Sequence, residues 1–244
     1  MTVVLVHGVP DTERSWDRLR AELARTDVTA VSLPGFGVPT PPGFGATKEE
    51  YAAWLEAEIL AFGEPVDLVA HDWGALLAQR VASVRPDVIR TLAIGSGPLD
   101  RTYTWHAMAQ AWQTPEVGEQ IMEGMLGMDR AELAAGLAAG GAPEDLARIE
   151  AEHVDATMAG CILNLYRSAV HVGDEWQDAL DAMPVRPALV FHGADDPYLG
   201  TEIAERIATR LHAELVVYDG CSHWWAWARA AETAAALMRL WDSV

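Results

Sequence analysis

Short apolar runs recur along the chain and are separated by segments with helical periodicity. Each run is four to six residues long and rich in β-branched side chains, which is typical of strands buried on both faces of a parallel sheet. The strand-like runs are Val3–Val6, Val28–Ser32, Val66–Ala70, Ile89–Ile94, Ala188–Phe191 and Leu215–Tyr218. Helices are expected over roughly residues 12–25, 47–62, 74–84, 201–211 and 225–241. This alternation predicts an α/β fold with a mostly parallel sheet of about six strands, joined by right-handed crossovers.

The alternation stops between about Pro98 and Pro184. This segment has no clear strand pattern, holds six of the eight methionines and contains several alanine-rich helical stretches. So long a gap between consecutive strands predicts a helical cap inserted into the core. Residues 1–97 and 185–244 would then form the core and residues 98–184 the cap. The alternative is that the segment only adds helices to the core.

Composition restricts the classes of partner. The chain has 244 residues, half of them hydrophobic, which is enough for one globular domain with a sizeable core. A net charge of −19 argues against binding to nucleic acid or to anionic lipid. Two cysteines, Cys161 and Cys221, fit a reducing compartment better than a disulfide scaffold. We see no signal peptide and no membrane-spanning stretch, so the sequence predicts a cytoplasmic protein.

The strongest candidate for chemistry is the motif HDWG, where a strand turns directly into a helix. Ala70 and Gly74 stand two residues to either side of Asp72, and a tight turn of this kind requires small residues there. Such a turn presents a nucleophile at the end of the sheet, usually a serine. The alternative is that Asp72 only caps the helix that follows.

Three other strand ends carry polar or turn-forming residues. The first ends in the motif HGVP, whose loop can aim the Val9 N–H at a developing negative charge. A later strand is followed by Asp195 and Asp196, which would either orient a histidine or cap a solvated turn. The last strand is followed by His223, which could also be a packed core residue. Nucleophile, acid and histidine then follow one another in the order of a hydrolase triad, which strengthens the functional reading of Asp72 and His223.

The motifs HGVP, HDWG, GADD and GCSHW resemble those of the α/β-hydrolase superfamily, in its aspartate-nucleophile branch. That branch includes epoxide hydrolases and haloalkane and haloacetate dehalogenases, and the motifs are most similar to those of epoxide hydrolases. The resemblance covers nearly the whole chain. It implies an α/β-hydrolase fold with a helical cap, Asp196 rather than Asp195 as the acid, and a cis peptide between Val9 and Pro10.

The family normally has two strands before the one that comes first here. The strand Val28–Ser32 would then be an uncovered edge of the sheet, and such an edge must be protected or paired. Pairing between two copies of the chain at this edge is one solution. Both a monomer and a homodimer therefore stay open.

An aspartate nucleophile indicates substitution at saturated carbon. Attack on an acyl carbon would give an anhydride, whereas attack on an sp³ carbon that carries a leaving group gives an alkyl ester on Asp72. His223, oriented by Asp196, would then activate a water that hydrolyses the ester. The oxyanion of that step would lie at the backbone N–H groups of Val9 and Trp73. No metal or organic cofactor is expected.

The leaving group depends on the cap. The segment CILNLYRSAV resembles an Asn-X-Tyr-Arg segment of epoxide hydrolase caps, whose tyrosine donates to the epoxide oxygen. This implies that Tyr166 is a proton donor, whereas the alternative is a helix tyrosine with its hydroxyl at the surface. Met108 stands where the family commonly has a second tyrosine, so His106 or, more weakly, Tyr103 would replace it. Trp105 is a candidate halide donor.

The sequence therefore predicts an epoxide hydrolase that forms a vicinal diol through an ester on Asp72. One alternative is a haloalkane or haloacetate dehalogenase with the same triad, although Val9 and Trp73 stand where those enzymes often have Asn and Arg. Another is a binding protein that kept the fold without turnover. The expected partners are water and a small apolar substrate, because the cap is rich in Met and Trp. The residues expected to contact substrate are His106, Trp105, Met108, Pro10 and Trp224.

Overall fold

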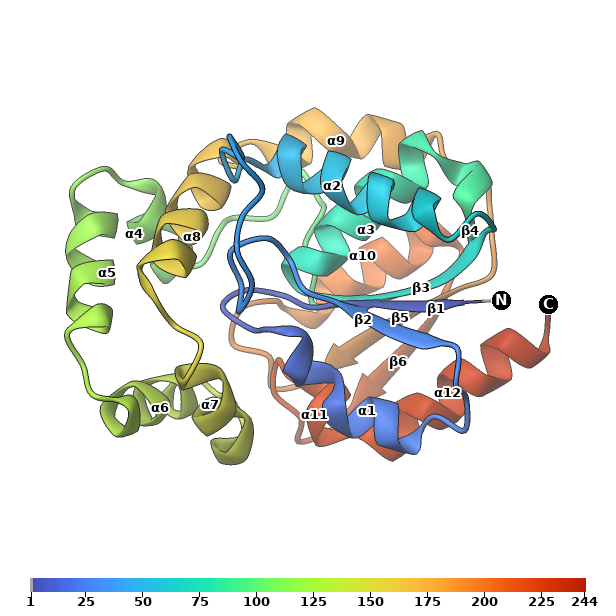
Figure 1. Ribbon diagram of the computed structural model, residues 1–244. Helices are drawn as coiled ribbons and strands as arrows, with labels where there is room; N and C mark the ends of the chain where they lie inside the picture. Colours follow the sequence, from blue (N-terminus) through green and yellow to red (C-terminus); the bar gives the residue numbers. More distant parts are fainter. Residues whose placement is uncertain (1) are drawn as a thin grey trace.

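The computed structural model describes residues 2–244 and confirms an α/β fold built on one six-stranded parallel sheet (Figure 1). The spatial order is β2-β1-β3-β4-β5-β6, and every neighbouring pair is parallel. As expected, the strand at residues 28–31 forms one edge. The strands are β1 (Val3–Val6), β2 (Val28–Val31), β3 (Val66–His71), β4 (Ile89–Gly95), β5 (Ala188–Gly193) and β6 (Glu214–Tyr218).

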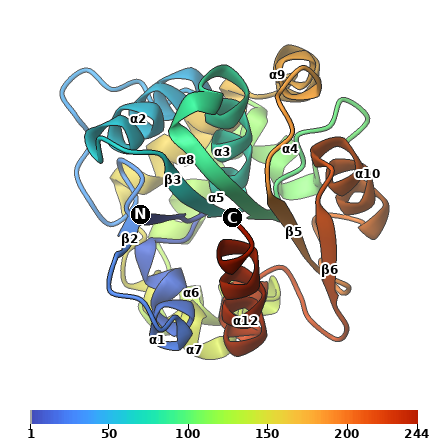
Figure 2. The ribbon, with the colours of Figure 1, turned by 90° about the vertical axis from the view of Figure 1, so that its right-hand side faces the viewer.

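Burial explains why the central strands are continuous apolar runs. Every residue of β1, β3 and β5 is buried, whereas the edge strands β2 and β6 are partly exposed. Two layers of helices cover the faces of the sheet (Figures 1 and 2). One layer holds α2 (Lys48–Ala61), α3 (Trp73–Val84), α9 (Val172–Asp181) and α10 (Thr201–Leu211). The other holds η1 (Glu13–Trp16), α1 (Asp17–Glu22), α11 (Trp225–Ala228) and α12 (Ala230–Asp242), and a short turn, η2 (Pro86–Val88), precedes β4.

Two helices are divided where the pattern predicts one. Over residues 12–25 a 3₁₀ turn precedes α1, which already ends at Glu22, and over residues 225–241 Arg229 separates α11 from α12. The side chain of Thr12 accepts the N–H of Arg14 and begins the 3₁₀ turn. Apolar spacing continues through both breaks, so periodicity alone does not reveal them.

Between β4 and β5 every residue is described, and none lies in a strand. Helices α4 to α8 lie beyond the carboxyl ends of the strands (Figure 1), whereas α9 packs on α3. The boundaries of the expected cap, residues 98–184, stay a prediction. Among the described residues, no helix is both long and apolar enough to cross a membrane. The helices beyond the strand ends are α4 (Ala107–Gln113), α5 (Val117–Leu126), α6 (Arg130–Ala139), α7 (Glu144–Ala151) and α8 (Ala156–Ser168).

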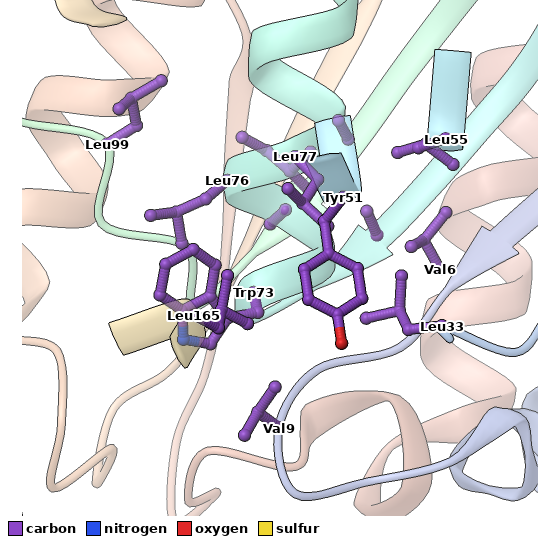
Figure 3. Close-up of a cluster of buried hydrophobic side chains, with 14 of the residues drawn as sticks. Val6, Val9, Leu33, Tyr51, Leu55, Trp73, Leu76, Leu77, Leu99 and Leu165 are labelled. Atoms are coloured by element: carbon purple, nitrogen blue, oxygen red, sulfur yellow. The ribbon is translucent and has the colours of Figure 1, made fainter. Parts of the chain in front are cut away.

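Apolar contacts join these helices to the sheet. Trp73, at the start of α3, belongs to a buried cluster with Val9 and Leu165 of α8 (Figure 3). Val9 lies in the loop after β1, which we call the first loop. A smaller cluster joins α7 to the segment after β6, where Leu146 and Ala147 pack with Trp224. The loops at the strand ends and the helices beyond them are therefore held together by core packing, and the candidate site lies between them.

Candidate active site

Asp72 lies at a sharp turn between β3 and α3. Its backbone has φ 50° and ψ −121°, a left-handed conformation that costs energy for a residue with a side chain. The turn fits only because two neighbours are glycines: a Cβ on Gly74 would collide with the carbonyls of Val6 and His7, and one on Gly8 would collide with Asp72 itself. The sequence thus places the carboxylate at the end of the sheet, close against the first loop.

The first loop donates a hydrogen bond to this carboxylate. The N–H of Val9 lies 2.8 Å from Oδ2 of Asp72, and the Val9–Pro10 peptide is cis, as the resemblance implies. His7 fixes the loop: Nε2 accepts the N–H of Leu33 at 2.9 Å, so the proton is on Nδ1, which donates to the Gly8 carbonyl at 2.7 Å. Burial lowers the pKa of His7 and keeps the ring neutral.

His223 and Asp196 form a buried pair. Nδ1 of His223 lies 2.9 Å from Oδ2 of Asp196, whose side chain has no exposed surface. The other oxygen of Asp196 accepts the N–H groups of Tyr198 and Leu199, at 2.9 and 3.2 Å. Asp195 is exposed. The structure therefore brings Asp196, the favoured of the two aspartates, to the histidine.

Electrostatics in this pair favours a charged histidine. Burial opposes ionisation of Asp196, but the His223 charge and several hydrogen bonds outweigh it and lower its pKa to about 2. Burial also opposes the imidazolium of His223, yet the charges of Asp196 and Asp72 help to raise its pKa to about 9. Nε2 of His223 is 3.8 Å from Oδ1 of Asp72, which is beyond hydrogen-bond range.

Two residues that contact the His223–Asp196 pair were not predicted from the sequence. Ser96, just after β4, has φ 56°, and its hydroxyl donates to Oδ2 of Asp196 at 2.9 Å. Tyr198 packs its ring at 5.0 Å from that of His223 and donates its hydroxyl to the Gly140 carbonyl at the end of α6. Both follow strands, and the rule that polar groups gather at strand ends could have found Ser96.

A cavity of about 280 Å³ lies over Asp72 and His223. We call the strand-end loops its floor and helices α4 to α8 its roof. Asp72 and His223 line it from the floor, whereas Trp73 and Asp196 are not among its lining residues. Trp105, predicted to contact substrate, lines only a small neighbouring space. Met125 and Met128 extend the lining along the roof and were not predicted. The other predicted residues that line the cavity are Val9, Pro10, His106, Met108, Tyr166 and Trp224.

Tyr166 of α8 lies in an aromatic cluster beside Asp72. It is 2% exposed, and its ring centroid is 5.3 Å from both Trp73 and Trp105. Burial and the charge of Asp72 raise the pKa of Tyr166 well above its usual value, so the hydroxyl keeps its proton. Two of the other candidate donors have partners elsewhere: the Tyr103 hydroxyl donates to the Tyr198 carbonyl at 3.0 Å, and the Trp105 indole donates to the Ala169 carbonyl at 3.2 Å.

His106 is held as a neutral ring with a defined proton. Its Nδ1 accepts the N–H of Ala109 at the start of α4, at 3.3 Å, so a neutral ring carries its proton on Nε2. Burial lowers the pKa of His106, although the charge of Asp72 acts the other way. The residue lines the main cavity and a second space of about 10 Å³, which is lined also by Asp72, His223 and Ser96. That volume is about what one water molecule needs.

Comparison with known proteins identifies the fold family. The sequence profile described as the alpha/beta hydrolase family matches residues 3–236. The chain belongs to this family. The superfamily resemblance read from the four motifs is therefore confirmed. Among the described residues, no cluster of three or more His, Cys, Asp or Glu side chains could hold a metal ion.

Curated relatives of this alpha/beta hydrolase differ in activity. The (E)-2-((N-methylformamido)methylene)succinate hydrolase of Acinetobacter baylyi is 25% identical over 233 residues, which cover 91% of this chain and 82% of that protein. A haloalkane dehalogenase of Mycolicibacterium paratuberculosis is 27% identical over 225 residues, covering 81% and 68%. An epoxide hydrolase of Neurospora crassa is 30% identical over 100 residues, covering 36% and 28%. These relatives indicate a hydrolase and leave its specific activity open.

Solved structures agree on the fold. A loop variant of the haloalkane dehalogenase DbeA from Bradyrhizobium elkanii superposes with a TM-score of 0.78 at 21% identity, covering 99% of this chain and 90% of that one. A thermophilic esterase from Thermogutta terrifontis superposes with a TM-score of 0.79 at 21% identity, covering 100% of this chain and 90% of that one. At such identities the likeness concerns the fold alone, which the neighbours confirm as that of an α/β-hydrolase.

Proposed function

We propose that the protein is an epoxide hydrolase that opens an epoxide to a vicinal diol. The observation that carries this proposal is that Asp72 and Tyr166 both line one cavity. The Trp105 indole and the Tyr103 hydroxyl donate to backbone carbonyls instead. An epoxide oxygen leaves as an alkoxide and needs a proton, which a buried tyrosine hydroxyl can give. A halide needs fixed N–H donors and no proton.

In the first step Asp72 attacks a ring carbon of the epoxide. The bond between that carbon and the ring oxygen breaks, an ester forms on Asp72, and the oxygen takes a proton from Tyr166. His106 presents an Nε2 proton at the same cavity and is proposed as the second donor to that oxygen. The ester keeps every atom of the epoxide, and this distinguishes the reaction from displacement of a halide.

Ester formation then makes His223 available as a base. With Asp72 charged, the pKa of His223 is about 9, so the ring holds a proton at neutral pH. The ester carries no charge, the pKa of His223 therefore falls, and the released proton restores Tyr166. Nε2 can now take a proton from water, which attacks the carboxyl carbon of Asp72. The oxyanion forms where the Val9 N–H points, with the backbone N–H of Trp73 proposed as its second donor. The bond between the carboxyl carbon and the alkyl oxygen then breaks, that oxygen takes the proton from His223, and the diol leaves. Asp72 passes its remaining proton to His223, which restores the starting state.

The lining of the cavity favours an uncharged, apolar substrate. Of the described residues that line it, none is Lys or Arg, and most are apolar or aromatic. Protonated His223 is the cation of the lining, but it is already paired with Asp196 and lies beside Asp72, so a substrate carboxylate would lose its hydration there without gaining a free counter-ion. A cavity of about 280 Å³ suits a mono-aryl or short-chain epoxide.

One observation favours a second candidate, a haloalkane dehalogenase. The indole N–H of Trp73 is buried and has no hydrogen-bond partner of normal geometry among the described residues. It faces the Tyr166 hydroxyl, and a halide beside Asp72 could receive it instead. Against this, Val9 offers no side-chain donor and the Trp105 N–H is already used. A single side-chain donor makes a weak halide site.

Product analysis tests the proposal. The purified protein is incubated separately with styrene oxide and with a bromoalkane of similar size, and the diol and the bromide are measured. Diol formation that Asp72→Ala abolishes, with little bromide released, is the expected result. Fast bromide release with little diol would replace the proposal with the dehalogenase. Neither product across a range of sizes would favour a non-catalytic binding protein.

A further inference from the structure

Asp11 is a buried carboxylate outside the proposed triad. Its side chain is almost fully enclosed, and its two oxygens accept the indole N–H of Trp224 at 3.0 and 3.1 Å. Oδ2 lies 3.7 Å from Nδ1 of His71. Burial opposes ionisation, but the contacts with His71 and Trp224 outweigh it and lower the pKa of Asp11. The carboxylate is therefore negatively charged at neutral pH.

The partners of Asp11 are chain neighbours of the reacting groups. Trp224 follows His223, His71 precedes Asp72, and Asp11 itself directly follows the first loop that donates to Asp72. His71 completes the arrangement because its Nε2 lies 3.1 Å from the backbone carbonyl of His223. A carbonyl only accepts hydrogen bonds, so this Nε2 is a donor. One carboxylate thus connects the segments of the oxyanion loop, the nucleophile and the base.

We propose that Asp11 is a positioning residue for His223 and a second buried charge, besides Asp196, that stabilises its imidazolium. This assignment rests on the proposed function, because it concerns the step in which His223 takes a proton from water. Once Asp72 is an ester, its charge is lost. Asp196 and Asp11 are then the two carboxylates left to stabilise the proton that arrives on the ring.

The electrostatic part of the inference concerns the charges around His223. The charge of Asp11, together with those of Asp196 and Asp72, raises the pKa of His223 against the effect of burial. The charged and titratable groups that face Asp11 or His223 come from several elements. They are His7 after β1, His71 on β3, His106 before α4, Glu150 on α7, His192 on β5 and Tyr198 after β5, besides Asp72 and Asp196.

Among these groups, Glu150 is the carboxyl that the roof contributes. Burial and the charge of Asp11 raise the pKa of Glu150 to about 9, so at neutral pH it is uncharged. Glu150 therefore adds no negative charge that would stabilise a protonated histidine in place of Asp11. Burial likewise lowers the pKa values of His7 and His106 and keeps both rings neutral at neutral pH.

The test compares two aspartates that each accept an indole N–H from the same segment. Asp11→Asn removes the charge but leaves an amide oxygen that can accept the N–H of Trp224. The matched control is Asp145→Asn: Asp145 accepts the indole N–H of Trp227 at 3.1 Å and touches none of the reacting groups.

Two readouts separate charge from packing. In NMR titration of labelled histidine, with His223 assigned through His223→Gln, we expect its midpoint to fall by about one pH unit in Asp11→Asn. In single-turnover reactions with styrene oxide, ester formation should stay within about twofold. The limiting rate of ester hydrolysis should fall about tenfold, with its pH midpoint moved to lower pH. Asp145→Asn should change neither readout.

An unchanged His223 midpoint, with hydrolysis slowed equally at all pH values, would overturn the proposal and leave Asp11 a packing role. An equal loss in ester formation would overturn it as well. If the parent protein forms no ester, the proposed function fails, while the NMR midpoint still decides the charge effect. If Asp11→Asn does not fold, Asp11→Ser replaces it in the NMR titration. The His223 midpoint should again fall by about one pH unit, and an unchanged midpoint would contradict the proposal.

Discussion

The floor and the roof of the cavity are built in different ways. On the floor each polar group has fixed partners: Asp72 accepts the N–H of Val9, and Asp196 accepts hydrogen bonds from His223 and Ser96. The roof is mostly apolar, and Tyr166 is its hydroxyl beside the nucleophile. Under the proposed function, the floor carries out the nucleophilic substitution and the ester hydrolysis that follows. The roof would then decide which group leaves and which substrates enter.

This division has an electrostatic basis. Fixed donors and buried charges on the floor need no rearrangement when charge develops, which is where most catalytic stabilisation arises. The methionines of the roof are flexible and adapt to shape, so they discriminate by size and charge rather than by hydrogen bonds. Changes on the floor should accordingly stop turnover, whereas changes on the roof should alter what is turned over.

Removing the proposed nucleophile from the floor should cause the largest loss of activity. We expect Asp72→Ala to lower kcat for styrene oxide by roughly 10⁴-fold, because no group is left to form the ester. Initial rates of diol formation measure this. The control is Asp195→Ala, an exposed aspartate next to Asp196, which should keep the parent rate. Comparable losses in both variants would contradict the assignment.

Removing the hydroxyl of Tyr166 tests the contribution of the roof without changing the floor. Tyr166→Phe should lower kcat for the epoxide by about 10²-fold, since ring opening then lacks its main proton donor. Any slow displacement of bromide from a bromoalkane, which needs no proton, should stay within about twofold. Parallel assays of diol and bromide provide the measurement. Equal losses for both substrates would mean that Tyr166 shapes the cavity and does not donate a proton.

A charge at the edge of the roof should change substrate choice. Met128 lines the cavity and is 46% exposed, whereas Leu126 is 41% exposed and does not line it. Met128→Arg should raise kcat/KM for an anionic epoxide such as glycidate about tenfold relative to styrene oxide, because the guanidinium supplies a counter-ion. Leu126→Arg should leave that ratio unchanged. A similar change in both variants would indicate general attraction to the surface.

Glu150 offers the smallest and most local test of the contact between roof and floor. Burial and Asp11 raise its pKa to about 9, so from about pH 5 to pH 9 the folded state holds a proton that the unfolded state releases. Stability is therefore lost as the pH rises through this window. Glu150→Gln should flatten the fall of Tm between pH 5 and 9, whereas Glu152→Gln, an exposed neighbour, should not. An unchanged slope in Glu150→Gln would contradict a buried neutral carboxyl.

The floor was predictable because strand ends converge. Parallel strands bring their carboxyl ends to one edge of the sheet, so the motifs after β1, β3, β5 and β6 had to meet there. The residues of these motifs, Val9, Asp72, Asp196 and His223, do lie together. Ser96 follows β4 at the same edge but lacks a motif that would single it out.

The roof and the supporting contacts were harder to predict. Helical periodicity indicates that the helices exist, but it does not say which side chains turn towards Asp72. The donors Tyr103 and Trp105 illustrate this, because their partners are backbone carbonyls that only the folded chain brings close. Asp11 was likewise hidden, since its bond with Trp224 joins residues 213 positions apart.

The central claim is that Asp72 attacks an epoxide carbon and that the ring oxygen stays on the intermediate. Intact mass of His223→Gln after exposure to styrene oxide tests it most directly, because this variant should form the ester without hydrolysing it. The expected result is a gain equal to the whole epoxide, absent when Asp72→Ala is added to the same chain. No gain with styrene oxide, together with a gain of only the alkyl group from a bromoalkane, would contradict the claim and assign the site to halide displacement.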